Sequence, residues 1–302
     1  MPLDLGMDCY LQGRILPEAE ARVPLLDRGF MLGDGIFETI AIHGGRPEFL
    51  SQHLERMFHS AEALLIPTPV TAPQMVEILD ELIARNRVSH GRARLTLSRG
   101  VPVSDLDDAT PRPWTDDWKP TLSVVVRPVT NARAPATVKL ITATRLMAPG
   151  TVARQHKSLS YLDLLHARHI ARERGAFDAL MLNTNGHVVE CSIANVMWLD
   201  AQGHVCTPSL QAGCLPGIMR GVAIAACRAQ GVRVFEGQYP VADMLRARSV
   251  WAMNSTLRAV PVTHLDAKEL NFDASANARL TQALDMRAAE SRHDHTRLPW
   301  WR

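Results

Sequence analysis

Lysine is rare in this sequence, and one lysine lies at a position suited to amine chemistry. Of the 33 lysine and arginine residues in the 302-residue chain, only those at positions 119, 139, 157 and 268 are lysine. Lys157 follows a predicted loop and precedes a predicted helix, 158–174. The positive end of a helix dipole disfavours a cation, so this position favours the neutral amine that forms a Schiff base with a carbonyl group. Taken alone, the pattern fits an ordinary surface lysine as well.

Several other reactive patterns do not occur in the sequence. The chain has no Walker A loop and no G-x-G-x-x-G, H-E-x-x-H or G-x-S-x-G pattern, which argues against nucleotide-binding, metalloprotease and serine-hydrolase functions. The best-spaced histidine pair, His166 and His169, lies among arginines on a predicted helix. This arrangement is typical of a solvated face, so we expect no metal site. Five cysteines, an odd number without a C-x-x-C pair, indicate reduced thiols in a cytoplasmic protein.

The overall composition is that of an ordinary globular protein. Hydrophobic residues make up 46% of the chain, charged residues make up 21%, and the formal net charge is +2. This charge balance argues against a nucleic-acid or membrane-surface partner. No run of 18 apolar residues predicts a membrane span, and the first residues lack the apolar core of a secretory signal.

The predicted elements divide the chain into two parts. Strands and helices mix without regular βαβ alternation, which favours an α+β fold with two domains. We expect a smaller N-terminal domain at 1–128, a linker at 129–136 and a larger C-terminal domain at 137–302. Within the first domain, four prolines and five aspartates in 100–120 predict a long loop. The predicted strands are 9–11, 37–42, 93–98, 122–127, 138–143, 179–183, 188–191, 195–199, 232–236 and 250–253, and the predicted helices are 50–65, 72–87, 158–174 and 218–230.

Six sequence blocks, in a fixed order, resemble the class IV aminotransferase family, which comprises the fold-type IV pyridoxal-phosphate enzymes. The family includes branched-chain and D-amino-acid aminotransferases and aminodeoxychorismate lyase. The resemblance extends over about residues 8–265 and implies the two-domain fold-type IV architecture, a pyridoxal 5'-phosphate cofactor and a homodimer. The blocks are DRGFMLGDGIFET (27–39), HLERM (53–57), HKSLSYL (156–162), GHVVECSIANVMW (186–198), TPSLQAGCLPGIMR (207–220) and MNSTLRAVPV (253–262).

The resemblance implies a role for three residues around the cofactor ring. Lys157 matches the lysine that forms the internal aldimine and then carries a proton at the substrate carbon. Glu190 matches the carboxylate beside the pyridine nitrogen, whose protonation makes the ring an electron sink. Tyr161 matches the tyrosine that hydrogen-bonds the phenolate oxygen of the cofactor.

A second group of residues matches the family's phosphate ligands. Arg56 matches the arginine that holds the phosphate, for which a planar guanidinium is suited. The main-chain N–H groups of Ile218 and Met219 follow Pro216-Gly217 and would present a helix N-terminus to the phosphate. Ser255 matches a hydroxyl that also reaches it.

Residues for substrate binding are implied by the same blocks. Arg94 lies where branched-chain enzymes place an arginine for the substrate carboxylate. Thr39 matches a position associated with the lyase branch, and Thr256 is a further candidate. Leu32 stands where branched-chain enzymes have a tyrosine, which argues against branched-chain specificity.

Two reactions follow from the resemblance. The first is transfer of an amino group between an amino acid or amine and a 2-oxo acid. The alternative is a 4-amino-4-deoxychorismate lyase, which uses the same cofactor and lysine but eliminates pyruvate. Tyr161 favours the first reaction and Thr39 favours the second.

Overall fold

The computed structural model describes residues 6–103, 118–129 and 135–293. The chain forms two compact units. The first contains the described residues up to 129 together with 157–160 and 291–293, and the second contains 135–156 and 161–290. Each unit is described by itself below.

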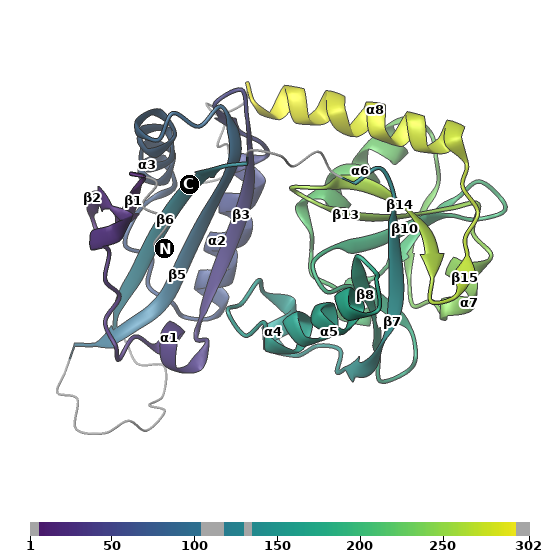
Figure 1. Ribbon diagram of the computed structural model, residues 1–302, viewed down its shortest axis with the longest axis horizontal. Helices are drawn as coiled ribbons and strands as arrows, with labels where there is room; N and C mark the ends of the chain where they lie inside the picture. Colours follow the sequence, from purple (N-terminus) through teal and green to yellow (C-terminus); the bar gives the residue numbers. More distant parts are fainter. Residues whose placement is uncertain (1–5, 104–117, 130–134, 294–302) are drawn as a thin grey trace. The chain divides into compact units, whose positions relative to one another are not determined.

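The first unit is built on a six-stranded antiparallel sheet with the strand order β2-β1-β6-β5-β3-β4 (Figure 1). Alternate residues of β3 and β5, such as Ile36, Ile40 and Leu95, enter its hydrophobic core. Helices α2 (Leu50–Ala63) and α3 (Ala72–Arg85) contribute apolar residues at three- and four-residue spacing to the same core. The strands are β1 (Asp8–Leu11), β2 (Arg14–Pro17), β3 (Gly35–His43), β4 (Arg46–Pro47), β5 (His90–Pro102) and β6 (Trp118–Pro128), and a short helix, α1 (Arg28–Leu32), precedes β3.

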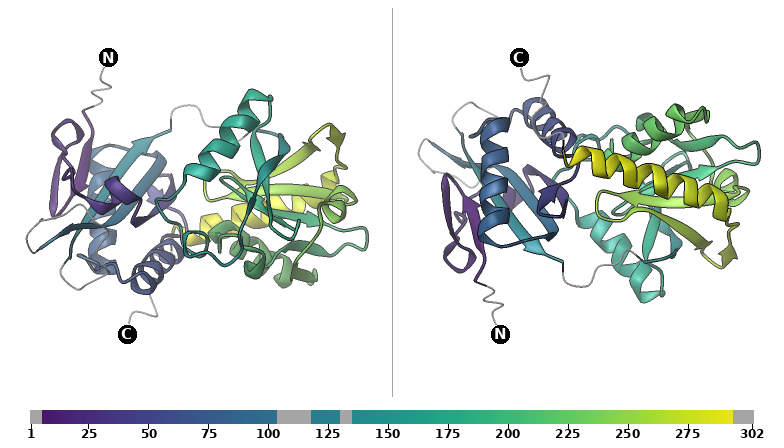
Figure 2. Two further views of the ribbon diagram at one scale, coloured as in Figure 1. Left: turned by 90° about the horizontal axis from the view of Figure 1, so that it is seen from below. Right: turned by 90° about the horizontal axis from the view of Figure 1, so that it is seen from above.

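The second unit contains a nine-stranded mixed sheet with the order β12-β11-β10-β13-β14-β7-β8-β9, and β15 pairs with β14. Its parallel pairs are β11–β12, β14–β7 and β7–β8. The long helix α8 (Ala274–Ser291) crosses this sheet (Figure 2) and is tied to it where Trp251 Nε1 donates to Asn277 Oδ1 at 3.0 Å. The strands are β7 (Val138–Met147), β8 (Asp178–Asn183), β9 (Val188–Cys191), β10 (Asn195–Leu199), β11 (Val205–Pro208), β12 (Val234–Gly237), β13 (Ser249–Asn254), β14 (Arg258–Leu265) and β15 (Lys268–Glu269), and the other helices are α4 (Val152–Gln155), α5 (Leu162–Glu173), α6 (Ile218–Ala229) and α7 (Val241–Leu245).

These elements confirm the predicted α+β fold and correct one feature that bears on the site. The predicted helix 158–174 is wrong at its start, because α5 begins only at Leu162. Residues 157–160 are instead extended along the edge of β3. Phe37 N donates to Lys157 O at 2.8 Å, Leu159 N donates to Gly35 O at 2.8 Å, and Ile36 pairs with Ser158 as an antiparallel bridge. Main-chain bonding to an open strand edge therefore overrides the local helical pattern.

The two units differ from the predicted boundaries at 1–128, 129–136 and 137–302 in two places. Residues 157–160 belong with the first unit because of their pairing with β3. Residues 291–293 also belong there, since Phe49 N donates to Ser291 Oγ and Arg292 pairs with Glu48. Most of the predicted loop 100–120 and of the linker lies outside the described residues, although β5 and β6 extend into the former from both sides.

None of the helices in the described ranges combines the length and the hydrophobicity that a membrane crossing requires.

Candidate active site

Three glycines of the DRGFMLGDG block make room for the segment that carries Lys157. A Cβ on Gly35 would lie 2.7 Å from Leu97 O and 2.8 Å from Leu159 Cδ1, both closer than side-chain carbons approach. A Cβ on Gly29 would lie 2.5 Å from Ser98 Cβ of β5 and 3.2 Å from Leu159 Cδ1. Gly33 ends α1 with a φ of +68°, where glycine is favoured, and its carbonyl faces Ser160 Oγ at 3.5 Å. The glycines of this block thus allow close packing against both β5 and the lysine segment.

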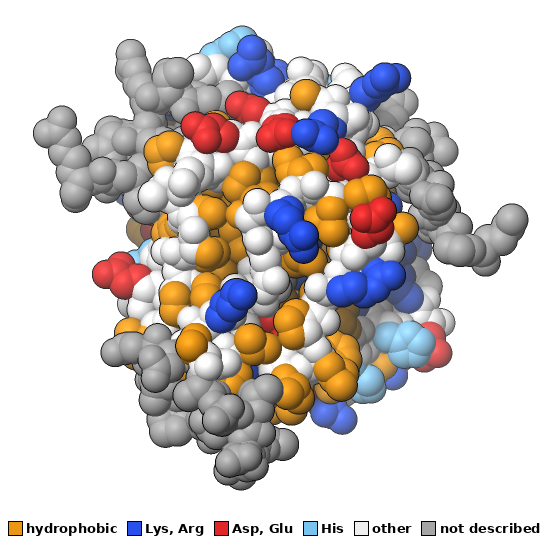
Figure 3. Space-filling view, turned by 90° about the vertical axis from the view of Figure 1, so that its left-hand side faces the viewer, with side chains coloured by type: hydrophobic (Ala, Val, Ile, Leu, Met, Phe, Trp, Pro, Cys, Tyr) orange, Lys and Arg blue, Asp and Glu red, His pale blue; other side chains and the backbone are white. Residues whose placement is uncertain are grey.

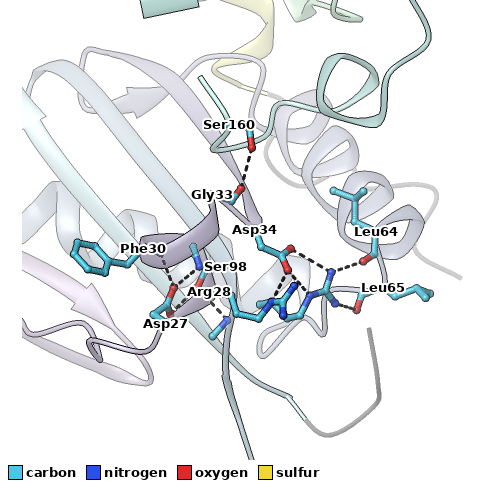
Figure 4. Close-up of polar contacts among 12 residues, drawn as sticks. Asp27, Arg28, Phe30, Gly33, Asp34, Leu64, Leu65, Ser98 and Ser160 are labelled. Atoms are coloured by element: carbon cyan, nitrogen blue, oxygen red, sulfur yellow. Dashed lines mark hydrogen bonds and ion pairs between the residues drawn. The ribbon is translucent and has the colours of Figure 1, made fainter. Parts of the chain in front are cut away.

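Asp27 fixes the beginning of this block. Its side chain caps α1 by accepting hydrogen bonds from Gly29 N at 2.8 Å and Phe30 N at 3.3 Å. Its other oxygen accepts from Ser98 Oγ of β5 at 2.8 Å (Figure 4). The cap is therefore anchored to the sheet as well as to its own helix.

Asp34 fixes the end of the block. Its carboxylate accepts from Arg28 Nε at 2.8 Å and from Arg99 Nε at 2.9 Å (Figure 4). Arg99 is fully buried and also donates to the carbonyls of Leu64 and Leu65, where α2 ends. This network ties the glycine block to the helix that carries His53 and Arg56.

Lys157 lies over an aromatic ring that a second cation also contacts. Lys157 Nζ is 4.4 Å from the ring centroid of Phe37, and Arg94 Cζ is 3.4 Å from the same centroid. Arg94 is directly opposite Thr39 in the β3–β5 register. The structure therefore brings together three of the predicted site residues, Lys157, Arg94 and Thr39, around Phe37.

On the helix-covered side of the sheet, Glu38 holds two side chains of α2. Arg56 donates from Nε and Nη2 to the two Glu38 oxygens, both at 2.7 Å, in a bidentate pair. His53 Nδ1 is 2.6 Å from Glu38 Oε2. Glu38 and His53 are almost fully buried, and Arg56 is only 11% exposed, so the arginine points inward. We call Lys157, Phe37, Arg94, Glu38, His53 and Arg56 the lysine cluster.

The protonation states within this buried triad follow from its charges. Burial alone would raise the pKa of Glu38, but the charges of Arg56 and His53 and their hydrogen bonds outweigh it and lower the pKa to about 2. Burial lowers the pKa of His53, against the attraction of Glu38 and with a further contribution from the charge of Lys157. His53 is therefore neutral at neutral pH, and its Nδ1–H donates to the Glu38 carboxylate.

In the second unit, Glu190 is a buried carboxylate held by neutral donors. It lies on β9, and its Oε2 accepts from Asn195 Nδ2 and from Leu215 N, both at 3.1 Å. Asn195 Nδ2 also donates to Leu215 O at 3.0 Å. We call Glu190, Asn195 and Leu215 the carboxylate cluster. These hydrogen bonds from neutral donors fix the position of the Glu190 oxygen.

The turn that contains Leu215 leads directly into α6. Gly217 is the N-cap of this helix, and Ile218 and Met219 are its first residues. Main-chain N–H groups in a first helical turn have no acceptor within the helix and form an anion site together with the dipole. These two residues thus lie as the sequence predicts, at the start of a twelve-residue helix.

The remaining predicted residues lie at the ends of other elements of this unit. Ser255 is half-buried just after β13, and Thr256 beside it is exposed and donates from Oγ1 to Asn254 Oδ1 at 3.0 Å. Tyr161 is the N-cap residue of α5 and packs against the hydrophobic cluster of that helix.

Three residues of these clusters were not among the predicted site residues: Glu38, His53 and Asn195. Glu38 could have been found, because it is a charged residue between Ile36 and Ile40 on the core-facing side of a strand, where a charge requires a partner. His53 has a similar signal, since it lies on the apolar face of α2 beside Leu54. Nothing in the sequence pairs Asn195 with Leu215.

Each unit by itself has groups that suit a part of pyridoxal phosphate. The first unit has an amine and a guanidinium. The second unit has a helix N-terminus suited to a phosphate and a buried carboxyl group suited to a ring nitrogen. Across the described ranges, no three His, Cys, Asp or Glu side chains lie close enough together to hold a metal ion.

All five cysteines are buried free thiols. Burial raises the pKa of Cys191, beside Glu190, well above its ordinary value.

Comparison with known proteins agrees with this chemistry. Residues 35–265 match the family model for amino-transferase class IV. A Methanocaldococcus jannaschii protein provisionally named a branched-chain-amino-acid aminotransferase is 30% identical over 266 residues, which cover 88% of this chain and 90% of that protein. Aminodeoxychorismate lyase from Bacillus subtilis is 29% identical over 279 residues, 92% of each chain.

Solved structures have the same fold. A 4-amino-4-deoxychorismate lyase, provisionally so named, from Legionella pneumophila superposes with a TM-score of 0.81 at 27% identity over 89% of this chain and 97% of its own. A Mycobacterium tuberculosis aminotransferase of hypothetical function, solved with pyridoxal phosphate bound, superposes with a TM-score of 0.82 at 25% identity over 94% of this chain and 100% of its own. Together with the family match over most of the sequence, these findings establish that the chain belongs to the class IV aminotransferases.

Proposed function

We propose that this protein is a pyridoxal-phosphate-dependent aminotransferase that moves an amino group between an amino acid or amine and a 2-oxo acid. The observation that carries the proposal is the placement of Lys157. Its main chain is fixed on the edge of β3, and its amine lies 4.4 Å from the ring centroid of Phe37. A lysine held this way presents its amine at a defined position, as a nucleophile requires.

Each cluster has a distinct role in this reaction. The cofactor, when bound, supplies an aldehyde that takes up amines and a ring that accepts electrons. The amine of Lys157 would hold that aldehyde and, once released, would carry the proton at the substrate α-carbon. Glu190 would hold the ring nitrogen and the phenol of Tyr161 would hold the ring oxygen.

Four groups hold the phosphate in this proposal. They are the guanidinium of Arg56, the main-chain N–H groups of Ile218 and Met219, and the hydroxyl of Ser255. A guanidinium has five N–H donors, so Arg56 can bind Glu38 through two of them and still reach a phosphate oxygen. The Glu38 carboxylate then fixes the orientation of the Arg56 guanidinium.

Substrate binding follows from the charges around Phe37. The guanidinium of Arg94 brings a permanent positive charge there, and an anionic carboxylate is the complementary group. We assign the substrate carboxylate to Arg94, with Thr39 and Thr256 as hydroxyl contacts. The substrates are therefore a small amino donor and a 2-oxo acid acceptor.

Borohydride trapping tests the assignment of Lys157. The purified protein is incubated with pyridoxal phosphate, reduced with borohydride and mapped by peptide mass spectrometry. We expect the label on Lys157 and not on Lys268, an exposed lysine on β15 that serves as the internal control. A label spread over both lysines, or the same labelled fraction in the Lys157→Ala variant, would reject the proposal.

A second candidate reaction is the elimination of pyruvate from 4-amino-4-deoxychorismate. It is favoured by the 29% identity to the Bacillus subtilis lyase over 92% of both chains. The two reactions differ in their requirement for an acceptor. Pyruvate release from aminodeoxychorismate without an added 2-oxo acid would identify the lyase. Conversion of the bound cofactor to its amine form by a simple amino acid would identify the aminotransferase.

We also propose that the protein is a homodimer through the first unit. Hydrophobic side chains cover much of one face of this unit (Figure 3). Leu25 is 75% exposed and Phe30 is 72% exposed, and four more apolar residues between positions 23 and 32 are at least 39% exposed. Patches of this kind usually mark an interface. Sedimentation equilibrium should give twice the chain mass, and Leu25→Glu should shift it towards the monomer, whereas a monomeric parent protein would contradict this assignment.

A further inference from the structure

We propose that Asn195 is a positioning residue that ties the Glu190 carboxylate to the turn leading into α6. This inference rests on the proposed function, in which Glu190 faces the ring nitrogen and the start of α6 faces the phosphate. It adds that one side chain sets the position of both groups. The coenzyme ring and its phosphate are parts of one rigid molecule, so their two binding elements must keep a fixed spacing.

The hydrogen bonds around Asn195 form a closed ring. Its amide nitrogen has two N–H groups, and the two acceptors at 3.1 and 3.0 Å are Glu190 Oε2 and Leu215 O. Leu215 closes the ring by donating its N–H to the same Glu190 oxygen at 3.1 Å. Since both neighbours of Nδ2 are acceptors, the amide orientation is fixed and Oδ1 must face the other way.

The other side of the amide explains a glycine. A Cβ added to Gly217 would overlap Asn195 Oδ1 and would also crowd its Cγ. Gly217 has a φ of −69° and a ψ of 139°, a conformation open to any residue. Glycine is therefore needed here for space and not for backbone freedom. The N-cap of α6 packs directly on the amide that holds Glu190.

Asn195 thus contacts the site in three places, Glu190, Leu215 and Gly217. It begins β10, which pairs with β13 in the middle of the sheet, so its backbone has a rigid support. Asn195 and Glu190 are each only 6% exposed, which leaves the Asn195 side chain little freedom for another rotamer. Through these contacts, the Asn195 side chain fixes the N-terminus of α6 relative to β10 of the sheet.

The first arm of the test measures coupling in the apo-protein, without any cofactor. Gly217→Ala should lower the melting temperature by at least about 4 °C, because the new methyl group must displace the amide. In the Asn195→Ala background the same substitution should cause less than half that decrease. Equal decreases in the two backgrounds would show that the side chains do not constrain each other and would overturn the inference.

The second arm measures cofactor binding. Asn195→Ala should weaken pyridoxal-phosphate binding about 10- to 100-fold and shift its absorbance maximum, since Glu190 Oε2 loses the hydrogen bond from the Asn195 amide. Asn195→Leu keeps the side-chain volume and should give the same loss, which provides a second variant if the first does not fold. Asn183→Ala is the control, because Asn183 is also a buried amide of this unit and its side-chain hydrogen bonds are to Ala212 O, Asn185 N and His187 N. This variant should leave the pyridoxal-phosphate affinity and the absorbance maximum unchanged.

The two arms separate this inference from the proposed function. If Asn195→Ala binds the cofactor normally while Glu190→Gln binds it weakly, Asn195 is not a positioning residue although the proposed function stands. If Glu190→Gln and Lys157→Ala both leave binding and labelling unchanged, the proposed function fails. The melting-temperature coupling then decides alone whether Asn195 constrains the turn.

Discussion

The two clusters hold their functional groups in different ways. In the lysine cluster, fixed charges compensate one another, since Glu38 pairs with Arg56 and accepts from a neutral His53. In the carboxylate cluster, an amide and a main-chain N–H donate to Glu190 Oε2. The first arrangement fixes the direction of a side chain by ionic geometry, and the second fixes a carboxyl oxygen by hydrogen bonds from neutral donors.

This difference matches the tasks that we propose for the two clusters. Arg94 brings a permanent positive charge to Phe37, which suits an anionic group of the substrate. Glu190 is a buried carboxyl group with hydrogen-bond donors to one oxygen, which suits a contact with a ring nitrogen. Each of the following predictions tests one side of this comparison.

Lys157→Arg should have the largest effect. Arginine keeps the cation over Phe37 but does not supply a neutral amine, so turnover should fall by about 10³-fold or more. The melting temperature should change little, because charge and approximate size are kept. Steady-state kinetics and thermal melts measure the two quantities, with Lys268→Arg as the control. A variant with more than a tenth of parental turnover would show that the cation, and not the amine, is what matters.

Glu38→Gln should have the largest effect on stability. It leaves the Arg56 charge buried without its carboxylate, which costs about 3–5 kcal/mol of unfolding free energy. Glu81→Gln breaks an exposed pair with Arg85 on α3, where both side chains are 51% exposed, and should leave the free energy of unfolding almost unchanged. Urea unfolding measures both. Similar losses for the two variants would refute the view that the buried triad organises the first unit.

Acid should weaken the first unit before the second. The pKa of Glu38 lies at about 2 in the folded protein, below its ordinary value of 4.5, so its contribution is present above pH 4.5 and is lost as the pH falls towards 2. That loss amounts to about 3 kcal/mol. Burial raises the pKa of Asp178 on β8 above its ordinary value of 3.8, against the hydrogen bonds from Ser192 and from main-chain N–H groups. Its contribution has the opposite sign and is largest at low pH.

Hydrogen exchange at pH 3 and pH 7, corrected for intrinsic rates, measures this difference. Amides of β3 and β5 should lose protection at pH 3 relative to those of β8 and β10. Glu38→Gln should remove most of the pH dependence in the first unit. Uniform loss of protection across both units would contradict the opposite titration of Glu38 and Asp178.

Arg94→Ala should have the smallest effect of the four. Loss of one charge-assisted contact to a substrate carboxylate should raise KM about tenfold with little change in kcat. Arg92→Ala is the matched control, because Arg92 is exposed two residues earlier on the same face of β5. Equal changes in KM for both variants would indicate general attraction of anions and not a specific contact.

Many strands and helices of both units were predictable because their patterns are local. Apolar spacing in α2 and α3 and local strand patterns in β3 and β5 predicted these elements within a few residues. β14 and α8 were missed. The helix α8 buries only a narrow stripe of Ala276, Leu280, Leu284 and Ala288, and β14 contains Pro261, which argues against a strand. The helical pattern after Lys157 was extended too far, since nothing local marks an edge strand that binds residues 120 positions away.

The sequence by itself determined the family, the identity of the reactive lysine candidate and the presence of glycines in the DRGFMLGDG block. Ordered motifs carry this information because they need no coordinates to be read. Only the tertiary structure decided that those glycines receive the Lys157 segment, that Arg56 is bound by Glu38 and that Asn195 links Glu190 to the start of α6. Such contacts join residues far apart in the chain, and burial is what makes their hydrogen bonds and charges strong enough to fix a site.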